Sequence, residues 1–198
     1  MELAEHTPAQ PVAGGAAGGG ASASAGGAGA TGGAAASGGR FAGEVDAALR
    51  RAGWYPGRLL AAQAEEWAHA VAAYTSPEGY RHSVFPAAVA AWAEFGGLQV
   101  DLEGLAGEGL LLARTPFTID PLLGLHQPRT LSDLGRALGD VEVAPLGAEL
   151  DARALLAVDE AGRVYSLDHS GEWFLGATLD HALTTLITGT LPHRLHVA

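Results

Sequence analysis

The spacing of apolar residues changes once along this chain, and that change limits the folds it can adopt. Between residues 41 and 95, large apolar residues recur every three or four positions, as Phe41, Val45 and Leu49 do, which is the period of a helix with one buried face. Over residues 98–102 they alternate with polar residues, which is the period of a half-buried strand. Helices therefore come first and strands follow, with one more helix near the end. This order favours an α+β fold with a largely antiparallel sheet over a doubly wound parallel sheet.

The bounds of the elements follow from the same periodicity and from the residues that interrupt it. We expect helices at 41–52, 60–74, 85–95, 130–138 and 179–188. We expect strands at 98–102, 109–115, 141–146, 154–158 and 163–167, and one further edge strand at 172–176. Thr130 and Asp133 resemble a capping box for the fourth helix, while Thr178 caps the last helix and Gly189 ends it. Segment 116–124 contains two prolines and is expected to be a loop.

Low-complexity sequence sets the expected domain boundaries. Residues 1–39 are mostly glycine and alanine, with Ser, Thr and Pro among the rest. Such a segment has too little large apolar surface to offset an ordering entropy of about 1–2 kcal/mol per residue, so we expect a disordered tail. Residues 40–190 are expected to form a single domain, and residues 191–198 a flexible C-terminal tail.

Composition narrows the classes of function. The chain has no cysteine, which excludes disulfides, thiolate metal sites and cysteine nucleophiles. Its 22 acidic and 11 basic residues give a formal net charge of −11, which disfavours binding to nucleic acid and favours a basic protein partner. The N-terminus lacks the features of a signal peptide, and no stretch approaches the roughly 20 apolar residues that span a bilayer. We therefore expect a cytoplasmic protein with no membrane partner.

Residue types that could carry catalysis are present, but they form no recognised pattern. The eight histidines include no His-x-x-x-His or His-Glu-x-x-His spacing, so we expect no metal and no cofactor. Asp168, His169 and Ser170 are the residue types of a hydrolase triad, but three adjacent side chains diverge, and a polar turn is the simpler interpretation. The numerous carboxylates are more typical of a solvated acidic face than of an acid/base pair. A binding module is therefore the default hypothesis, and a hydrolase using scattered His and carboxylates is a minor alternative.

Two short motifs about 40 residues apart carry a family resemblance. The first, GWYPGR, contains Gly53, Trp54, Pro56, Gly57 and Arg58, and the second, FGGL, contains Phe95, Gly96, Gly97 and Leu98. A later hairpin segment with Asp159, Gly162 and Tyr165, and a closing strand and helix with Gly176 and Gly189, follow in the same order. Together, over roughly residues 41–190, these motifs resemble the SUKH superfamily, and within it the third subfamily of bacterial immunity proteins.

The resemblance implies both a fold and a role. It implies a SUKH-like α+β domain that binds a cognate bacterial toxin domain of nuclease or deaminase type and neutralises it by surface complementarity, without catalytic residues of its own. It also implies a protein that stays in the cytoplasm. The alternative that the sequence leaves open is a non-catalytic regulatory or scaffold domain of the same fold with a different protein partner.

The GWYPGR corner itself has two interpretations. In the structural one, Trp54 packs against the first and third helices, while Arg58 donates hydrogen bonds to a carbonyl or pairs with an acid. In the functional one, Trp54 or Tyr55 and Arg58 contact the partner, because Trp, Tyr and Arg are enriched among interface anchors. For FGGL we expect a helix C-terminus and a close backbone approach.

Overall fold

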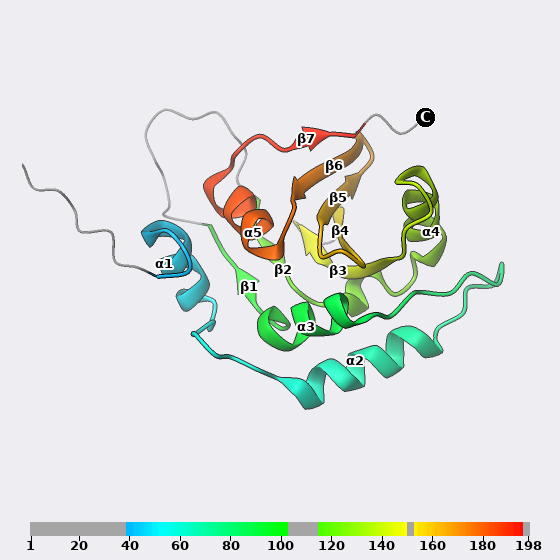
Figure 1. Ribbon diagram of the computed structural model, residues 1–198, viewed down its shortest axis with the longest axis horizontal. Coiled ribbons are helices and arrows are strands. Elements are labelled where there is room, and N and C mark those ends of the chain that lie inside the picture. Colours follow the sequence, from blue (N-terminus) through cyan, green and yellow to red (C-terminus); the bar gives the residue numbers. More distant parts are fainter. Residues whose placement is uncertain (1–38, 103–114, 150–152, 196–198) are drawn as a thin grey trace, which may run out of the picture. The chain divides into compact units, whose positions relative to one another are not determined.

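The computed structural model describes residues 39–102, 115–149 and 153–195, and Figure 1 shows the order of their helices and strands. The helices are α1 (Gly43–Arg51), α2 (Ala61–Ala73), α3 (Pro86–Phe95), the 3-10 helix η1 (Pro121–Gly124), α4 (Pro128–Ala137) and α5 (Leu179–Thr188). The strands are β1 (Gln99–Val100), β2 (Phe117–Thr118), β3 (Val143–Glu149), β4 (Ala154–Asp159), β5 (Val164–Asp168), β6 (Gly171–Gly176) and β7 (His193–Arg194). Each strand pairs antiparallel with the next one along the chain, in the order β1 to β7. The predicted α+β fold, with helices at the N-terminal end of the domain and one near its C-terminal end, is confirmed.

Helices cover both faces of this sheet. On one face, α1, α3 and α5 enclose the larger core with strand residues such as Leu156 and Val164, both of which are fully buried. On the other face, α4 places Leu131 and Leu134 against Tyr165 and its neighbours in a second, smaller core. In Figure 1, α5 and α4 accordingly lie on opposite sides of β4 and β5. Both faces are thus withdrawn from water, and so the inner strands are nearly continuously apolar.

A bulge in β3 joins the layers. The pairing of β3 with β4 shifts register between Pro145 and Gly147. Proline has no N–H to donate to a ladder, but it is tolerated here because the bulge interrupts the ladder. The Trp92 indole N–H of α3 donates to the Pro145 carbonyl at 3.0 Å, within the buried core. At Gly147, a Cβ would lie 2.0 Å from the Thr118 carbonyl oxygen of β2. The absence of a side chain at this position therefore lets β2 approach β3.

The structure differs from the sequence prediction between the first strand and α4. The strand expected at 109–115 lies mostly outside the described residues, and Thr115 is not in a strand. Segment 116–124, expected to be a loop, instead contains strand β2 and the 3-10 helix η1. Neither proline of this segment lies in the interior of an element, since Pro116 comes before β2 and Pro121 is the first residue of η1. Proline breaks a ladder or a helix only in its interior, so the loop prediction was wrong.

Two further predictions fail at the ends of elements. Helix α4 begins at Pro128 after Gln127, and Thr130 lies within its first turn, where its hydroxyl donates to the Gln127 side chain rather than capping the helix. Residues 193–194 were expected in a loose tail, but they form β7 and pair with β6, so β6 is not the edge strand. Both residues of β7 are exposed, which leaves no apolar alternation in the sequence to mark a strand.

Candidate functional site

Trp54 at the GWYPGR corner is a core residue. Only 3% of it is exposed, its ring stacks on Phe95 with centroids 6.1 Å apart, and it makes a T-shaped contact with the Phe41 ring at a centroid distance of 5.1 Å. Its indole N–H donates to the Glu94 carboxylate at 3.4 Å. The preceding Gly53 has a φ of 98°, so the chain leaves α1 through a left-handed glycine and turns the indole beneath α3. The stacked rings of Trp54 and Phe95 therefore connect the end of α1 to the end of α3.

Arg58 connects the two sequence motifs. Its guanidinium donates to the Glu94 carbonyl at 2.5 Å and to the Gly96 carbonyl at 2.7 Å, both at the C-terminus of α3. The last carbonyls of a helix have no partner within the helix, so these two bonds serve the function of a cap. Gly97 follows with a φ of 77°, and its N–H donates to the Ile119 carbonyl. The first motif thus holds the second in place as the chain passes from α3 into the sheet.

Close packing explains the glycine at the end of α3. A Cβ on Gly96 would lie 2.2 Å from the Trp67 ring and 2.3 Å from the Trp92 carbonyl, so α2 and α3 approach each other across this glycine. The flanking Phe95 and Leu98 are each 1% exposed. At FGGL the Trp67 ring of α2 therefore packs directly against the backbone of α3.

The Asp159 carboxylate organises the hairpin between β4 and β5. It is fully buried and accepts bonds from the backbone N–H groups of Ala161 and Arg163, from the Arg163 guanidinium at 2.6 Å and from the Tyr165 hydroxyl at 3.0 Å. Burial and the bond to Asp159 raise the pKa of Tyr165 to about 12. Gly162, with a φ of 82°, closes the turn. With its oxygens taken by four donors, this carboxylate supports the turn and is not available as a general base.

The remaining motif glycines position α5. A Cβ on Gly176 would lie 2.7 Å from the Ala182 nitrogen, so β6 and α5 meet closely at this point. Gly189 ends α5 in the left-handed conformation, with a φ of 70°. At the other end, the Thr178 hydroxyl accepts the His181 N–H, as predicted.

Asp168, His169 and Ser170 form a turn between β5 and β6. One Asp168 oxygen accepts the Ser170 N–H, the Ser170 hydroxyl and the Gly171 N–H. Burial acts to raise the pKa of Asp168, but bonds from Ser170, Trp173 and Gly171 outweigh it and hold the pKa below its ordinary value. The Ser170 hydroxyl is therefore bonded to an ionised carboxylate rather than to a histidine, as the polar-turn interpretation requires.

Neither a metal-binding cluster nor a membrane-spanning helix occurs among the described residues. No three His, Asp or Glu side chains of residues 39–102, 115–149 and 153–195 gather closely enough to hold a metal ion. Among the same residues, no helix is both long and apolar enough to cross a bilayer.

His82 is a buried neutral imidazole. It is 9% exposed, its Nε2–H donates to the Leu125 carbonyl at 2.8 Å, and its Nδ1 has no hydrogen-bond partner among the described residues. The Tyr74 ring lies beside it and bonds His126 through its hydroxyl at 3.0 Å. Burial lowers the pKa of His82 and the proximity of His126 lowers it further, against the opposing effect of the Leu125 carbonyl. The folded protein therefore resists protonation at this position.

This burial predicts a pH dependence of stability. As the pH falls below 6.5, the ordinary pKa of histidine, His82 binds a proton in the unfolded chain while it stays neutral in the folded one. Acidification therefore favours the unfolded state and lowers the free energy of unfolding. Above pH 6.5 both states are neutral and the contribution is constant. His82→Gln keeps a donor for the Leu125 carbonyl but does not titrate. We expect urea titrations between pH 7.5 and 5 to show a steeper loss in the native chain than in this variant, by at most about 1.4 kcal/mol per pH unit. Parallel profiles would contradict a buried neutral His82.

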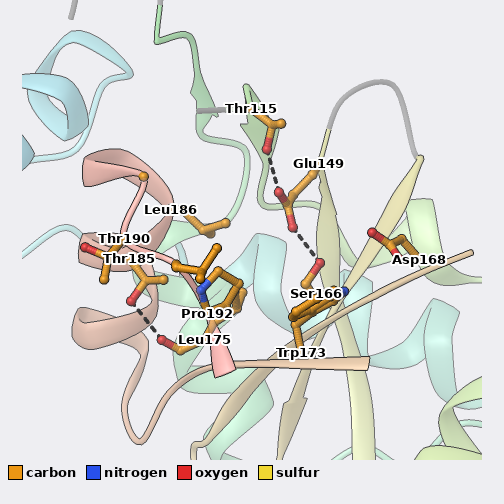
Figure 2. Close-up of a pocket in the computed structure, with 12 residues that line it drawn as sticks. Thr115, Glu149, Ser166, Asp168, Trp173, Leu175, Thr185, Leu186, Thr190 and Pro192 are labelled. Carbon is orange, nitrogen blue, oxygen red and sulfur yellow. Dashed lines mark hydrogen bonds between the residues drawn. The ribbon is translucent and has the colours of Figure 1, made fainter. Parts of the chain in front are cut away.

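A cleft of about 250 Å³ opens between α5, β6 and the segment after α5; we call it the α5 cleft. Its lining includes Trp173, Leu175, Leu186, Leu191 and Pro192 on the apolar side, and Glu149, Ser166 and Asp168 on the polar side. Figure 2 shows the hydroxyls of Thr115 and Ser166 directed at the Glu149 carboxylate. No motif in the sequence predicted this cleft, and of its polar residues only Asp168 was named there, as part of a polar turn. The available signal was a serine at an inward position of the apolar strand VYSLD.

A family model described as SUKH-3 immunity protein matches residues 41–189, about three quarters of the chain. The matched region contains both motifs, the hairpin and α5, and it ends at the glycine that terminates α5. No curated protein and no solved structure matches the chain.

Proposed function

Since the chain belongs to the SUKH-3 immunity protein family, we propose that it binds a cognate bacterial toxin domain in the cytoplasm and blocks it by covering its active surface. The observation that carries this proposal is the family match over residues 41–189, which spans every helix from the start of α1 to the end of α5. We further propose that the toxin is a nuclease or a nucleic-acid deaminase.

The charge of the chain supports this type of toxin. Enzymes that act on nucleic acids attract phosphates, so their substrate grooves are basic. A protein with a net charge of −11 is steered toward such a groove and repelled by the nucleic acid itself. The same electrostatics that bring the substrate to the toxin would then bring the inhibitor.

The motif residues support inhibition by binding rather than by a reaction. Trp54, Arg58 and Asp159 use their polar atoms on backbone carbonyls, backbone N–H groups and neighbouring side chains. The residues that carry the family resemblance therefore stabilise the fold, and other residues on the surface around them make the contact with the toxin. Tyr55 is the exposed aromatic residue of the corner, at 54%.

Co-expression tests the proposal directly. The full chain is expressed together with the toxin domain encoded by the neighbouring gene, and with an unrelated toxin as the specificity control. We expect growth to be restored only with the cognate domain, and a stable complex of the two chains to be recovered. Continued killing despite soluble expression of the chain would contradict an immunity role. Recovery of a complex with a non-toxin protein instead would favour the regulatory or scaffold alternative.

A further inference from the structure

The α5 cleft contains a carboxylate whose charge is not balanced within the described chain. Glu149 is half-buried, and its two oxygens each accept one hydroxyl bond at 2.5 Å, from Thr115 and from Ser166. Ser166 is itself only 4% exposed, so one of these two donors is fixed in the sheet. No arginine among the described residues forms an ion pair with Glu149. A carboxylate can accept about four hydrogen bonds, so each oxygen has capacity for one more donor.

We propose that the α5 cleft receives an arginine side chain of the toxin, with its guanidinium bound to Glu149. This inference rests on the proposed function. A guanidinium presents two parallel N–H groups, which can bond both oxygens of one carboxylate at once. The hydroxyls of Thr115 and Ser166 hold the carboxylate in place, so little freedom remains to be lost on binding.

The size and walls of the cleft favour a side chain over a cofactor. At about 250 Å³, the cleft lies below the roughly 300–1,000 Å³ of pockets that enclose small molecules. Trp173, Leu175 and Leu186 form apolar walls along which the methylene groups of an arginine can pack. Leu191, 73% exposed, and Pro192 lie on the same cleft and offer a partner protein additional apolar contact.

An arginine suits these walls better than other charged groups do. Aromatic rings accept guanidinium groups, and Trp173 already has the chain's own Arg194 at 5.6 Å from its ring centroid. Arg194 is not among the residues that line the cleft, and it donates to the Ser170 carbonyl instead. An anion would be repelled by Glu149 and Asp168. A basic toxin, which the net charge of −11 favours, has arginines to offer.

The first test does not require the toxin. The full chain is labelled with ¹⁵N and titrated with Nα-acetyl-arginine amide or with the uncharged isostere Nα-acetyl-citrulline amide, and NMR spectra are recorded. We expect the arginine compound to shift the Trp173 indole N–H and the Ser166 amide in a saturable manner, and the citrulline compound to leave both unchanged. Glu149→Gln should remove the response while keeping the size of the side chain and an acceptor for one of the two hydroxyls, and the other hydroxyl can turn to accept from the amide N–H. Equal shifts with both compounds, no shift at these two residues, or an unchanged response in the variant would each overturn the proposal.

The second test uses the complex with the toxin domain. We expect Glu149→Gln to weaken the complex at least tenfold, equivalent to about 1.4 kcal/mol. The exposed Glu65→Gln is the matched control, because it removes the same charge from α2 and should change the affinity less than twofold. A wild-type chain that binds no toxin would refute the proposed function. A wild-type complex that Glu149→Gln leaves unchanged would refute the arginine site alone.

Discussion

Trp54→Ala is expected to lower the free energy of unfolding by about 3–5 kcal/mol, the range for removing a large aromatic side chain from a core. The side chain is 3% exposed and fills the space between Phe41 and Phe95. Its removal leaves a cavity where α1 meets α3. Both helices also contribute to the larger core on one face of the sheet. Urea denaturation followed by circular dichroism measures the loss.

Two neighbouring variants make this result specific. Tyr55→Ala removes an aromatic side chain of similar size from the next position, where 54% of it is exposed, and should change stability by less than about 0.5 kcal/mol. Trp54→Phe keeps most of the apolar volume and should fall between the two. If Trp54→Ala were as stable as the native chain but failed to bind toxin, the core assignment of Trp54 would be wrong and the interface interpretation of the corner would replace it.

The elements with long and regular apolar spacing could be predicted from the sequence. The stripe through Val45 and Leu49 placed α1, and Thr178 with Gly189 placed both ends of α5. These signals are local, because capping and amphipathic spacing involve residues within one or two turns of each other. Their local character explains why the fold class was correct while several strand boundaries were not.

The features that the sequence did not reveal depend on contacts between distant segments. Strand β2 consists of two residues beside prolines, and it exists because Gly147 lets it approach β3. The α5 cleft requires Thr115, Glu149 and Ser166 to meet from three separate segments. No periodicity encodes such a meeting. The resemblance to immunity proteins identified the GWYPGR corner but not the carbonyl that Arg58 bonds. That bond joins Arg58 to Gly96, which lies 38 positions later in the chain.

Arg58→Ala is expected to destabilise the fold by about 2–3 kcal/mol, because hydrogen bonds from a charged donor contribute about 1.5–3 kcal/mol and water replaces part of what is lost. The variant leaves the carbonyls of Glu94 and Gly96 without their bonds from Arg58 at the C-terminus of α3. For a domain of this size, such a loss lowers the melting temperature by roughly 5–10 °C. Scanning calorimetry or thermal circular dichroism measures the change.

The affinity for the toxin separates a structural Arg58 from one that contacts the partner. Because both of its hydrogen bonds are directed into the protein, Arg58→Ala should bind a folded toxin domain nearly as tightly as the native chain, by titration calorimetry well below the melting temperature. Arg51→Ala, which removes an exposed arginine from the last turn of α1, is the matched control and should affect neither quantity by more than about 0.5 kcal/mol. Arg58→Lys can restore at most part of the stability, since an ammonium lacks the planar fork that reaches two carbonyls at once. An unchanged melting temperature combined with a lost complex would instead place Arg58 at the interface.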